Sequence, residues 1–164
     1  MTPITSSNPI GTILSIQIRK EKKGHREFLK QSRLIKAFGL EGDGHGGSGP
    51  RQVSLLSIES IQNQPNCPKF RKQGDHPGPG EFSENITTEG AVLSELRVGD
   101  QVRLGQETTL RITEKGRVCR QYCAVYKQEG GCPVPEDSLF AEVIKGGDIE
   151  VGDAIVILKS INEN

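Results

Sequence analysis

Short stretches in which apolar and polar residues alternate recur along the chain, and glycine-rich or charged turns separate them. In Gly11–Arg19 the side chains of Leu14, Ile16 and Ile18 are apolar and fall on one face, a period of two residues that predicts a half-buried strand. The same reasoning predicts strands near residues 12–19, 52–56, 101–104, 109–114 and 154–158. Many short strands with few helices favour a strongly bent β-sheet or barrel.

Two short helices and a single domain complete the expected architecture. Ser57 precedes a short apolar run and can act as an N-cap, so one helix is expected to begin near Ser57. A shorter helix is predicted near Pro135 to Val143. With 164 residues the chain fits one compact domain, placed at residues 10–160, after a disordered N-terminal lead at residues 1–9.

A repeated phrase marks two tight turns in the C-terminal half. LRVGDQVRL at 96–104 is similar to IEVGDAIVI at 149–157, and both place Val-Gly-Asp before an alternating strand. Gly99 and Gly152 are expected to adopt a positive φ in these turns, and the aspartate that follows each glycine can bond back to the backbone. The repeat therefore predicts two turns of the same kind, each leading into a strand.

Charge and composition exclude several classes of function. Lys plus Arg and Asp plus Glu are 21 each, so the net charge is zero and offers no general attraction to nucleic acid or anionic membranes. Aromatic residues are 4% of the chain, too few to build base-stacking platforms. No apolar stretch approaches the ~20 residues of a membrane span, and the polar N-terminus has no secretory core. We therefore expect a cytoplasmic protein with reduced cysteines and without nucleic-acid or membrane partners.

A glycine-rich loop, residues 41–50, is the first segment that could carry chemistry. It contains Gly42, Asp43 and His45 and is followed by Arg51 and Gln52. Glycines let backbone N–H groups approach a ligand, and a nearby Arg can grip phosphate or carboxylate with two hydrogen bonds. The loop is neither a Walker loop nor a dinucleotide fingerprint. It is therefore either an anion site or a surface turn with a solvated His and Arg.

The second candidate is a segment that contains Cys119, Cys123 and Cys132. Arg117 and Arg120 flank Cys119, and nearby cations stabilise a thiolate and lower the pKa of a cysteine. Cys119 is therefore predicted to be the reactive thiol, with Cys123 as the second choice. A structural zinc site is a competing interpretation, although the spacing is not that of paired zinc ligands. Cys123 and Cys132 could instead be small buried side chains.

Glu84 and Asn85, in the phrase FSENITT, are the third candidate. Their polar side chains could bind a ligand or brace the loop at Arg51. From the residues alone, bracing is the favoured role.

Taken in order, several phrases of the sequence resemble the molybdenum cofactor sulfurase C-terminal (MOSC) family, in particular its short stand-alone bacterial branch. The resemblance covers nearly the whole chain from Gly11 to Leu158. The matching phrases are GLEGDGHGG, RQVSLLSIESI, GEFSENITTEG, VGDQVRLG, ITEKGRVCRQYCAVY, GGCPVP and LFAEVIKGGDIEVGDAIVI. The sequence departs from the family at Cys132, because many short members have Gly-Asp before this cysteine and Met after it. A specific role for Cys132 therefore does not follow.

The resemblance implies a β-barrel-like fold with a few peripheral helices and a link to the molybdenum cofactor. Relatives install a terminal sulfur on molybdenum or form parts of molybdenum reductases that act on N-hydroxylated compounds. Their reactive cysteine is thought to carry sulfur or to ligate the metal, which makes Cys119 the implied persulfide carrier or molybdenum ligand. The chain lacks a pyridoxal-phosphate desulfurase domain. A separate cysteine desulfurase, which would bind the pyridoxal phosphate, or a molybdoenzyme is therefore the expected partner.

Three functions remain open at this point: a sulfur-carrier or cofactor-binding protein, a non-catalytic module that stores or delivers the cofactor, and a molybdenum-dependent reductase. In the first, the loop from Gly42 to Gly47, with His45 and Arg51, would hold the phosphate of the pterin. Glu84 and Asn85 would orient that loop or the pterin. The hypothesis predicts that the loop, Arg51 and Cys119 share one cleft.

Overall fold

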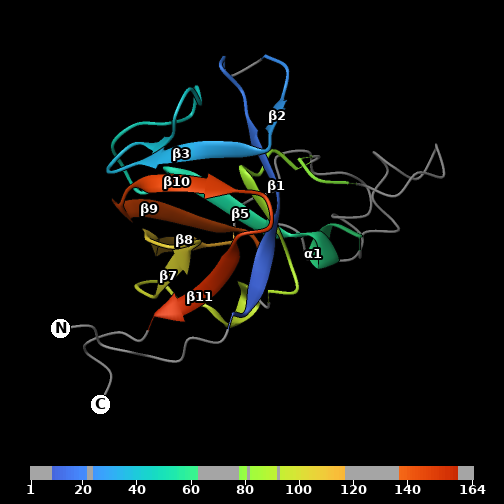
Figure 1. Ribbon diagram of the computed structural model, residues 1–164, viewed down its shortest axis with the longest axis vertical. Helices are drawn as coiled ribbons and strands as arrows, with labels where there is room; N and C mark the ends of the chain where they lie inside the picture. Colours follow the sequence, from blue (N-terminus) through green and yellow to red (C-terminus); the bar gives the residue numbers. More distant parts are fainter. Residues whose placement is uncertain are drawn as a thin grey trace.

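The computed structural model describes residues 9–21, 24–62, 78–80, 82–91, 93–116 and 137–158. Seven strands close into a barrel (Figure 1), because the two end strands of that set, β11 and β1, pair with each other. The barrel strands, in spatial order, are β11 (Ala154–Leu158), β7 (Gln101–Leu104), β8 (Thr108–Lys115), β9 (Leu139–Lys145), β5 (Val53–Ser57), β6 (Ile86–Glu89) and β1 (Gly11–Ile18). The mainly β, barrel-like fold that the sequence predicts is confirmed.

A smaller sheet of three strands lies above the barrel in the view of Figure 1. Its strands are β10 (Gly147–Glu150), β3 (Gln31–Ile35) and β4 (Gly39–Leu40). Leu34, Leu40 and Ile149 of this sheet belong to the same buried cluster as the barrel interior, so the small sheet closes part of the core. A further strand, β2 (Glu27–Leu29), pairs with the end of β1 and extends the main sheet beyond the barrel.

The five predicted strands correspond to β1, β5, β7, β8 and β11. Each differs from its predicted bounds by at most one residue at either end. In β7 and β8 alternate side chains are buried, as the period of two requires; in β8, for example, Leu110 and Ile112 are 0% and 1% exposed. In β1 the predicted face of Leu14, Ile16 and Ile18 is wrong at Leu14, because the register shifts between Ile13 and Ser15 and places Ile13 in the core instead. Leu14 packs against the smaller cluster beside α1. The other six strands, β2, β3, β4, β6, β9 and β10, are not among the five predicted.

One predicted helix is confirmed, and the other is wrong where it overlaps a strand. The helix α1 (Ile58–Gln62) begins directly after Ser57, whose Oγ accepts a hydrogen bond from the N–H of Ser60 at 3.1 Å, the contact of an N-cap. The helix predicted near Pro135 to Val143 is wrong from Leu139 on, because Leu139–Lys145 forms β9 between β8 and β5. Within its predicted range Asp137 is helical, and residues 135–136 lie outside the described residues. Alternate residues Leu139, Ala141 and Val143 point into the core, which is strand periodicity. Besides α1, the described residues contain one 3-10 turn, η1 (Leu93–Glu95), and one further helical residue, Asp137.

The two Val-Gly-Asp turns have the same geometry, as the repeated phrase predicts. Gly99 and Gly152 both have φ of 97°. In the first turn, the N–H of Asp100 donates to the carbonyl of Arg97 at 3.0 Å, and Asp100 Oδ2 accepts the N–H of Arg97 at 2.8 Å. Asp153 repeats both contacts with Glu150, at 3.1 and 2.8 Å. The turns lead into β7 and β11, which pair with each other in the barrel.

Some predictions fall on parts of the chain outside the described residues. These parts include the N-terminal lead, apart from Pro9, and residues 117–136 with Cys119, Cys123 and Cys132. The domain limits at residues 10 and 160 stay a prediction. No helix among the described residues combines the length and apolar character needed to cross a membrane.

Candidate functional site

Asp43 anchors the glycine-rich loop to the barrel through a buried carboxylate. Its side chain is 1% exposed. Oδ1 accepts a hydrogen bond from the N–H of Arg19, just after β1, at 3.2 Å. Oδ2 accepts one from Nδ2 of Asn85, just before β6, at 3.2 Å. A buried carboxylate needs such donors, because burying a charge without partners is strongly unfavourable.

Asn85 joins three elements to that carboxylate. Its Oδ1 accepts hydrogen bonds from the N–H and the Oγ of Ser54 in β5, at 3.0 and 3.2 Å. Besides Asp43, its Nδ2 contacts the carbonyl of Gln17 in β1 at 3.3 Å. Asn85 therefore ties the starts of β5 and β6 and the end of β1 to the loop. These contacts are those of a bracing residue.

Glu84 is buried and holds its own turn. Its Oε2 accepts hydrogen bonds from the N–H of Gly80 at 2.8 Å and from Oγ1 of Thr87 at 2.6 Å, while Oε1 accepts the N–H of Phe82 at 3.2 Å. Its side chain is thus engaged within the segment 80–87 and does not reach the loop directly. Of the two roles considered for Glu84, the observed contacts are those of bracing.

The first part of the glycine-rich loop uses its N–H groups internally. The N–H groups of Asp43, Gly44, Gly46 and Gly47 donate to the carbonyls of Leu40, Arg19, Asp43 and Phe38, at distances of 2.6 to 3.1 Å. Two of these glycines also pack closely against neighbouring residues. A Cβ on Gly44 would lie 2.6 Å from the carbonyl oxygen of Lys20, and a Cβ on Gly46 would lie 2.5 Å from the ring of Phe38. Close contact with backbone requires glycine at position 44, whereas a side chain at position 46 would have to displace the Phe38 ring. The N–H groups of this part of the loop are not directed at a ligand.

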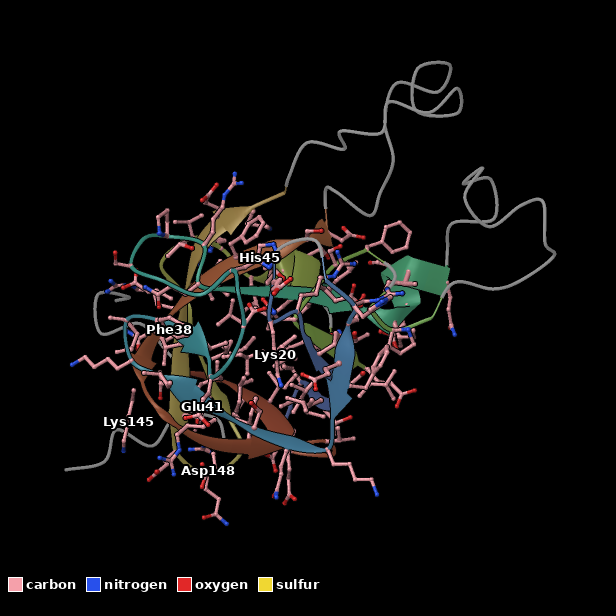
Figure 2. All side chains as sticks on the ribbon, turned by 90° about the horizontal axis from the view of Figure 1, so that it is seen from above. Lys20, Phe38, Glu41, His45, Lys145 and Asp148 are labelled. Carbon is pink, nitrogen blue, oxygen red and sulfur yellow. The ribbon has the colours of Figure 1, made fainter. Side chains whose placement is uncertain are left out.

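The second part of the loop is open. Gly47 and Gly49 have φ of 150° and 131°, and a Cβ on either would meet nothing within 4 Å. No described residue accepts a hydrogen bond from the N–H groups of His45, Ser48 or Gly49. The His45 side chain is 49% exposed, and its Nδ1 lies 3.8 Å from Oδ1 of Asp43. Figure 2 shows His45 on the loop, with Phe38 on the neighbouring turn.

Arg51 follows the loop and is clamped against β8. Its Nε and Nη2 donate to the two carboxylate oxygens of Glu114, both at 3.0 Å, and its guanidinium lies 4.7 Å from the centre of the Phe140 ring. The hydrogen bond and the charge of Glu114 raise the pKa of Arg51. The hydrogen bond from Arg51 lowers the pKa of Glu114 below its ordinary value, against a smaller opposing effect of burial.

A β-bulge at Thr113 makes this clamp possible. The register of β8 against β9 shifts between Ile112, which faces Ala141, and Glu114, which faces Phe140. Without the extra residue Glu114 would share the inward face of Ile112, two residues earlier. Thr113 Oγ1 also donates to the carbonyl of Pro50, so the end of the loop is tied to β8 at the bulge. Neither Glu114 nor Phe140 was a candidate from the sequence, because nothing in the residue pattern places a bulge there.

Gln52 is a structural bridge and is nearly buried, with 5% exposure. Its Oε1 accepts the N–H of Val143 in β9 at 2.9 Å, and its Nε2 donates to the carbonyl of Gly49 at 3.0 Å. Gly42, with φ of 83°, forms the turn that leads into Asp43. The structure thus brings Gly42, Asp43, His45 and Asn85 together at one end of the loop and Arg51 and Gln52 at the other.

The chain leaves β8 close to the Arg51 clamp. Glu114 is followed by Lys115 and Gly116, and the N–H of Gly116 donates to the carbonyl of Ser138 at 2.7 Å. This contact joins the two ends of the segment 117–136. Cys119 and Cys123 lie within that segment, so the prediction that Cys119 shares a cleft with Arg51 stays a prediction. In the part of the chain that the structure describes, no three His, Cys, Asp or Glu side chains are grouped as metal ligands.

Comparisons with known proteins identify the fold and the family. A family model described as the MOSC domain matches residues 42–156. The crystal structure of the YuaD protein from Bacillus subtilis has a TM-score of 0.66 at 16% identity, covering 90% of this chain and 94% of that chain. YiiM from Escherichia coli has a TM-score of 0.64 at 17% identity, covering 94% and 73%. YiiM from Geobacillus stearothermophilus has a TM-score of 0.64 at 16% identity, covering 91% and 75%.

At these identities the solved structures show a shared fold. No curated protein shows a significant sequence match to the chain. The family model spans well over half of the residues, including the glycine-rich loop, Arg51 and the cysteine segment. The protein therefore belongs to the MOSC domain family, which is associated with the molybdenum cofactor.

Proposed function

We propose that this protein acts in molybdenum cofactor metabolism through a reactive cysteine in the segment 117–136, with Cys119 as the first choice and Cys123 as the second. The cysteine would carry sulfur as a persulfide or ligate molybdenum. Besides family membership, the observation that supports this is the Arg51–Glu114 clamp. It holds the end of the glycine-rich loop against β8, and Glu114 precedes Cys119 by five residues. Functional groups concentrate on loops held by a rigid scaffold.

The open part of the loop has donors suited to the phosphate of a pterin cofactor. These are the N–H groups of His45, Ser48 and Gly49, the His45 side chain, and Nη1 of Arg51, which has no partner among the described residues. The inward N–H groups of Asp43, Gly44, Gly46 and Gly47 are excluded from this role, which narrows the expected contact surface to residues 45–51. When bound, the cofactor would supply molybdenum as the redox-active centre. Asp43, Gln52, Glu84 and Asn85 would shape the site without touching the ligand.

As a sulfur carrier, the cysteine would take part in a balanced exchange. Its thiolate attacks the terminal sulfur of a persulfide on a cysteine desulfurase, a separate protein that would hold pyridoxal phosphate. The new S–S bond forms on this chain while the donor's S–S bond breaks, and the donor's thiolate leaves. Arg117 and Arg120, on either side of Cys119, would keep it as thiolate. A molybdoenzyme would then accept the sulfur.

Expression in a host that makes the cofactor tests this proposal. We expect the purified protein to carry either a persulfide on Cys119 or bound pterin and molybdenum, detected by mass spectrometry and metal analysis. Cofactor without turnover would favour a storage or delivery module, and cofactor with turnover of a reducible substrate would favour a reductase. A protein with neither persulfide nor cofactor under these conditions contradicts the proposal.

Thiol alkylation against pH identifies the cysteine. In Cys119→Ser the fast-reacting thiol should be absent, whereas Cys123→Ser and Cys132→Ser should keep it. A fast thiol that survives in Cys119→Ser and is lost in Cys123→Ser moves the site to Cys123.

Arg51→Ala tests the loop, because it should weaken pterin binding by about tenfold or more, the effect of losing a charge-assisted bond. Arg111→Ala is the matched control. Arg111 lies on β8 and pairs with Glu142 at 3.0 Å in a similarly exposed ion pair. Equal loss of binding in both variants would show that Arg51 has no specific contact with the pterin.

A further inference from the structure

A hollow of about 240 Å³ lies at the end of β5 opposite the glycine-rich loop. Its walls come from α1, from the residues after β6, from η1 and from Asp137, just before β9. Figure 1 shows α1 beside the barrel at the end of β5. The volume is below that of the usual drug-sized pocket, about 300–1,000 Å³. It would therefore fit a small ligand.

Two serine hydroxyl groups at the α1 side of the hollow already donate hydrogen bonds within the protein. Ser57 Oγ donates to Ser60 Oγ at 3.1 Å, and Ser60 Oγ donates to Oδ2 of Asp137 at 2.6 Å. A serine hydroxyl has one hydrogen to donate. What these serines can still offer a ligand is lone pairs, so this side of the hollow accepts hydrogen bonds.

Two carboxylates add acceptors and negative charge. Glu59 Oε2 accepts the N–H of Gly90 at 2.9 Å, which leaves Oε1 without a partner among the described residues. Asp137 likewise has only Oδ2 engaged there. The described lining contains no Lys, Arg or His. Lys115 is at the rim, where its Nζ donates to the carbonyl of Ser94 at 2.8 Å, and it is not part of the lining.

The rest of the described lining consists of Gly90, Ser94 and two apolar side chains. Ala91 and Leu93 line the hollow and are 5% and 3% exposed, as part of the barrel core. A ligand that matches all of these walls has a positively charged nitrogen with several N–H donors and a short apolar body. We propose that this hollow binds a small primary amine in its ammonium form. This goes beyond the proposed cofactor function, and no cysteine takes part in the binding.

The hollow also adjoins the cysteine-bearing segment. Asp137 is the first described residue after the segment 117–136, and the N–H of Gly116, before it, bonds to the carbonyl of Ser138. An amine bound to Asp137 would thus lie directly beside the C-terminal end of that segment.

Three probes of similar shape test the proposal by NMR titration of the isotope-labelled full chain at pH 7. They are 3-methylbutylamine, 3-methylbutanol and 3-methylbutanoate. We expect saturable shifts of the amide resonances of Ser60, Gly90 and Ser94 with the amine, and no saturable shift there with the alcohol or the carboxylate. Because the readout needs neither thiol nor cofactor, it fails or succeeds independently of the proposed function.

Isosteric variants separate a specific contact from general attraction. Glu59→Gln and Asp137→Asn keep an oxygen that can accept from Gly90 and Ser60, but remove the negative charge, and each should weaken amine binding by about tenfold. Glu95→Gln is the control, because Glu95 is an exposed carboxylate in η1 that does not line the hollow. It should bind the amine as the wild type does. Equal binding of amine and alcohol, unchanged binding in both lining variants, or no binding of the amine at all would each overturn the proposal.

Discussion

The glycine-rich loop is held to the barrel at two places, by a buried polar contact at its beginning and by an exposed ion pair at its end. At its beginning, the carboxylate of Asp43 is 1% exposed and bonds to Asn85 and to the backbone of Arg19. At its end, Arg51 and Glu114 form a bidentate pair whose side chains are 55% and 32% exposed. Buried polar contacts are strongly destabilising to break, whereas exposed ion pairs contribute little to stability.

The two halves of the loop therefore have different roles: the first stabilises the fold, and the second presents donors to a ligand. In the first half, the buried anchor fixes the path of the loop, and the N–H groups of Asp43, Gly44, Gly46 and Gly47 bond to backbone carbonyls, so these residues serve the fold. The exposed clamp fixes Arg51 in place while leaving neighbouring donors in water. A guanidinium already ordered by an ion pair loses less freedom when it binds a second anion. We therefore expect mutations in the first half to reduce stability and mutations in the second half to reduce ligand binding.

The largest effect is expected for Asn85→Ala. The change removes the hydrogen bonds that Asn85 makes with the N–H of Ser54 and with Oδ2 of Asp43, both of which are buried. The free energy of unfolding should therefore fall by about 3 kcal/mol. Urea unfolding measures this. Asn85→Asp keeps an acceptor for Ser54 but places a second carboxylate against Asp43, so it should also be destabilised. If Asn85→Asp is as stable as the wild type, the contact between residues 85 and 43 is not the anchor.

A pair of glycine variants compares the two halves directly. In Gly44→Ala the new Cβ would lie 2.6 Å from the backbone oxygen of Lys20, and the free energy of unfolding should fall by about 2–3 kcal/mol. In Gly49→Ala the space is open, and only the φ of 131° opposes alanine, so the loss should be about 1 kcal/mol. Thermal or urea unfolding gives both values. Equal losses would mean that close packing does not distinguish the halves.

Local patterns explain which parts of the fold could be predicted from the sequence. The bounds of β7 and β11 follow from alternation after a Val-Gly-Asp turn, and the start of α1 follows from Ser57 as N-cap. All of these depend on residues within a few positions. Strand β9 was partly assigned to a helix, because its pairing with β8 and β5 is a tertiary fact that a short apolar run does not reveal.

The sequence indicated which residues belong to the site, but it could not indicate which residues they contact. Asn85 was expected to brace a loop, yet its partner Asp43 is 42 residues earlier in the chain, and the two meet only because β1, β5 and β6 come together. The inward direction of the N–H groups of Gly44 and Gly47 depends on the carbonyls of Arg19 and Phe38. The partner of Arg51 depends on a bulge. Glycine content alone could not distinguish an anion site from a packed turn.

The smallest expected effect concerns the exposed clamp and its dependence on pH. The pKa of Glu114 is lowered in the folded protein, first by the hydrogen bond from Arg51. A carboxyl group with a lowered folded pKa stabilises the fold above its unfolded pKa, and this contribution is lost as pH falls through the folded pKa. At pH 7, Glu114→Gln should therefore be less stable than the wild type by about 0.5–1 kcal/mol, the range of an exposed pair. The difference should shrink as the pH falls below the ordinary glutamate value of 4.5, and also in high salt. Urea unfolding of both proteins from pH 7 to pH 3 measures it. A difference that stays constant over this range would show that Glu114 acts through packing rather than charge. A difference well above about 2 kcal/mol would place the clamp in the same class as the buried anchor.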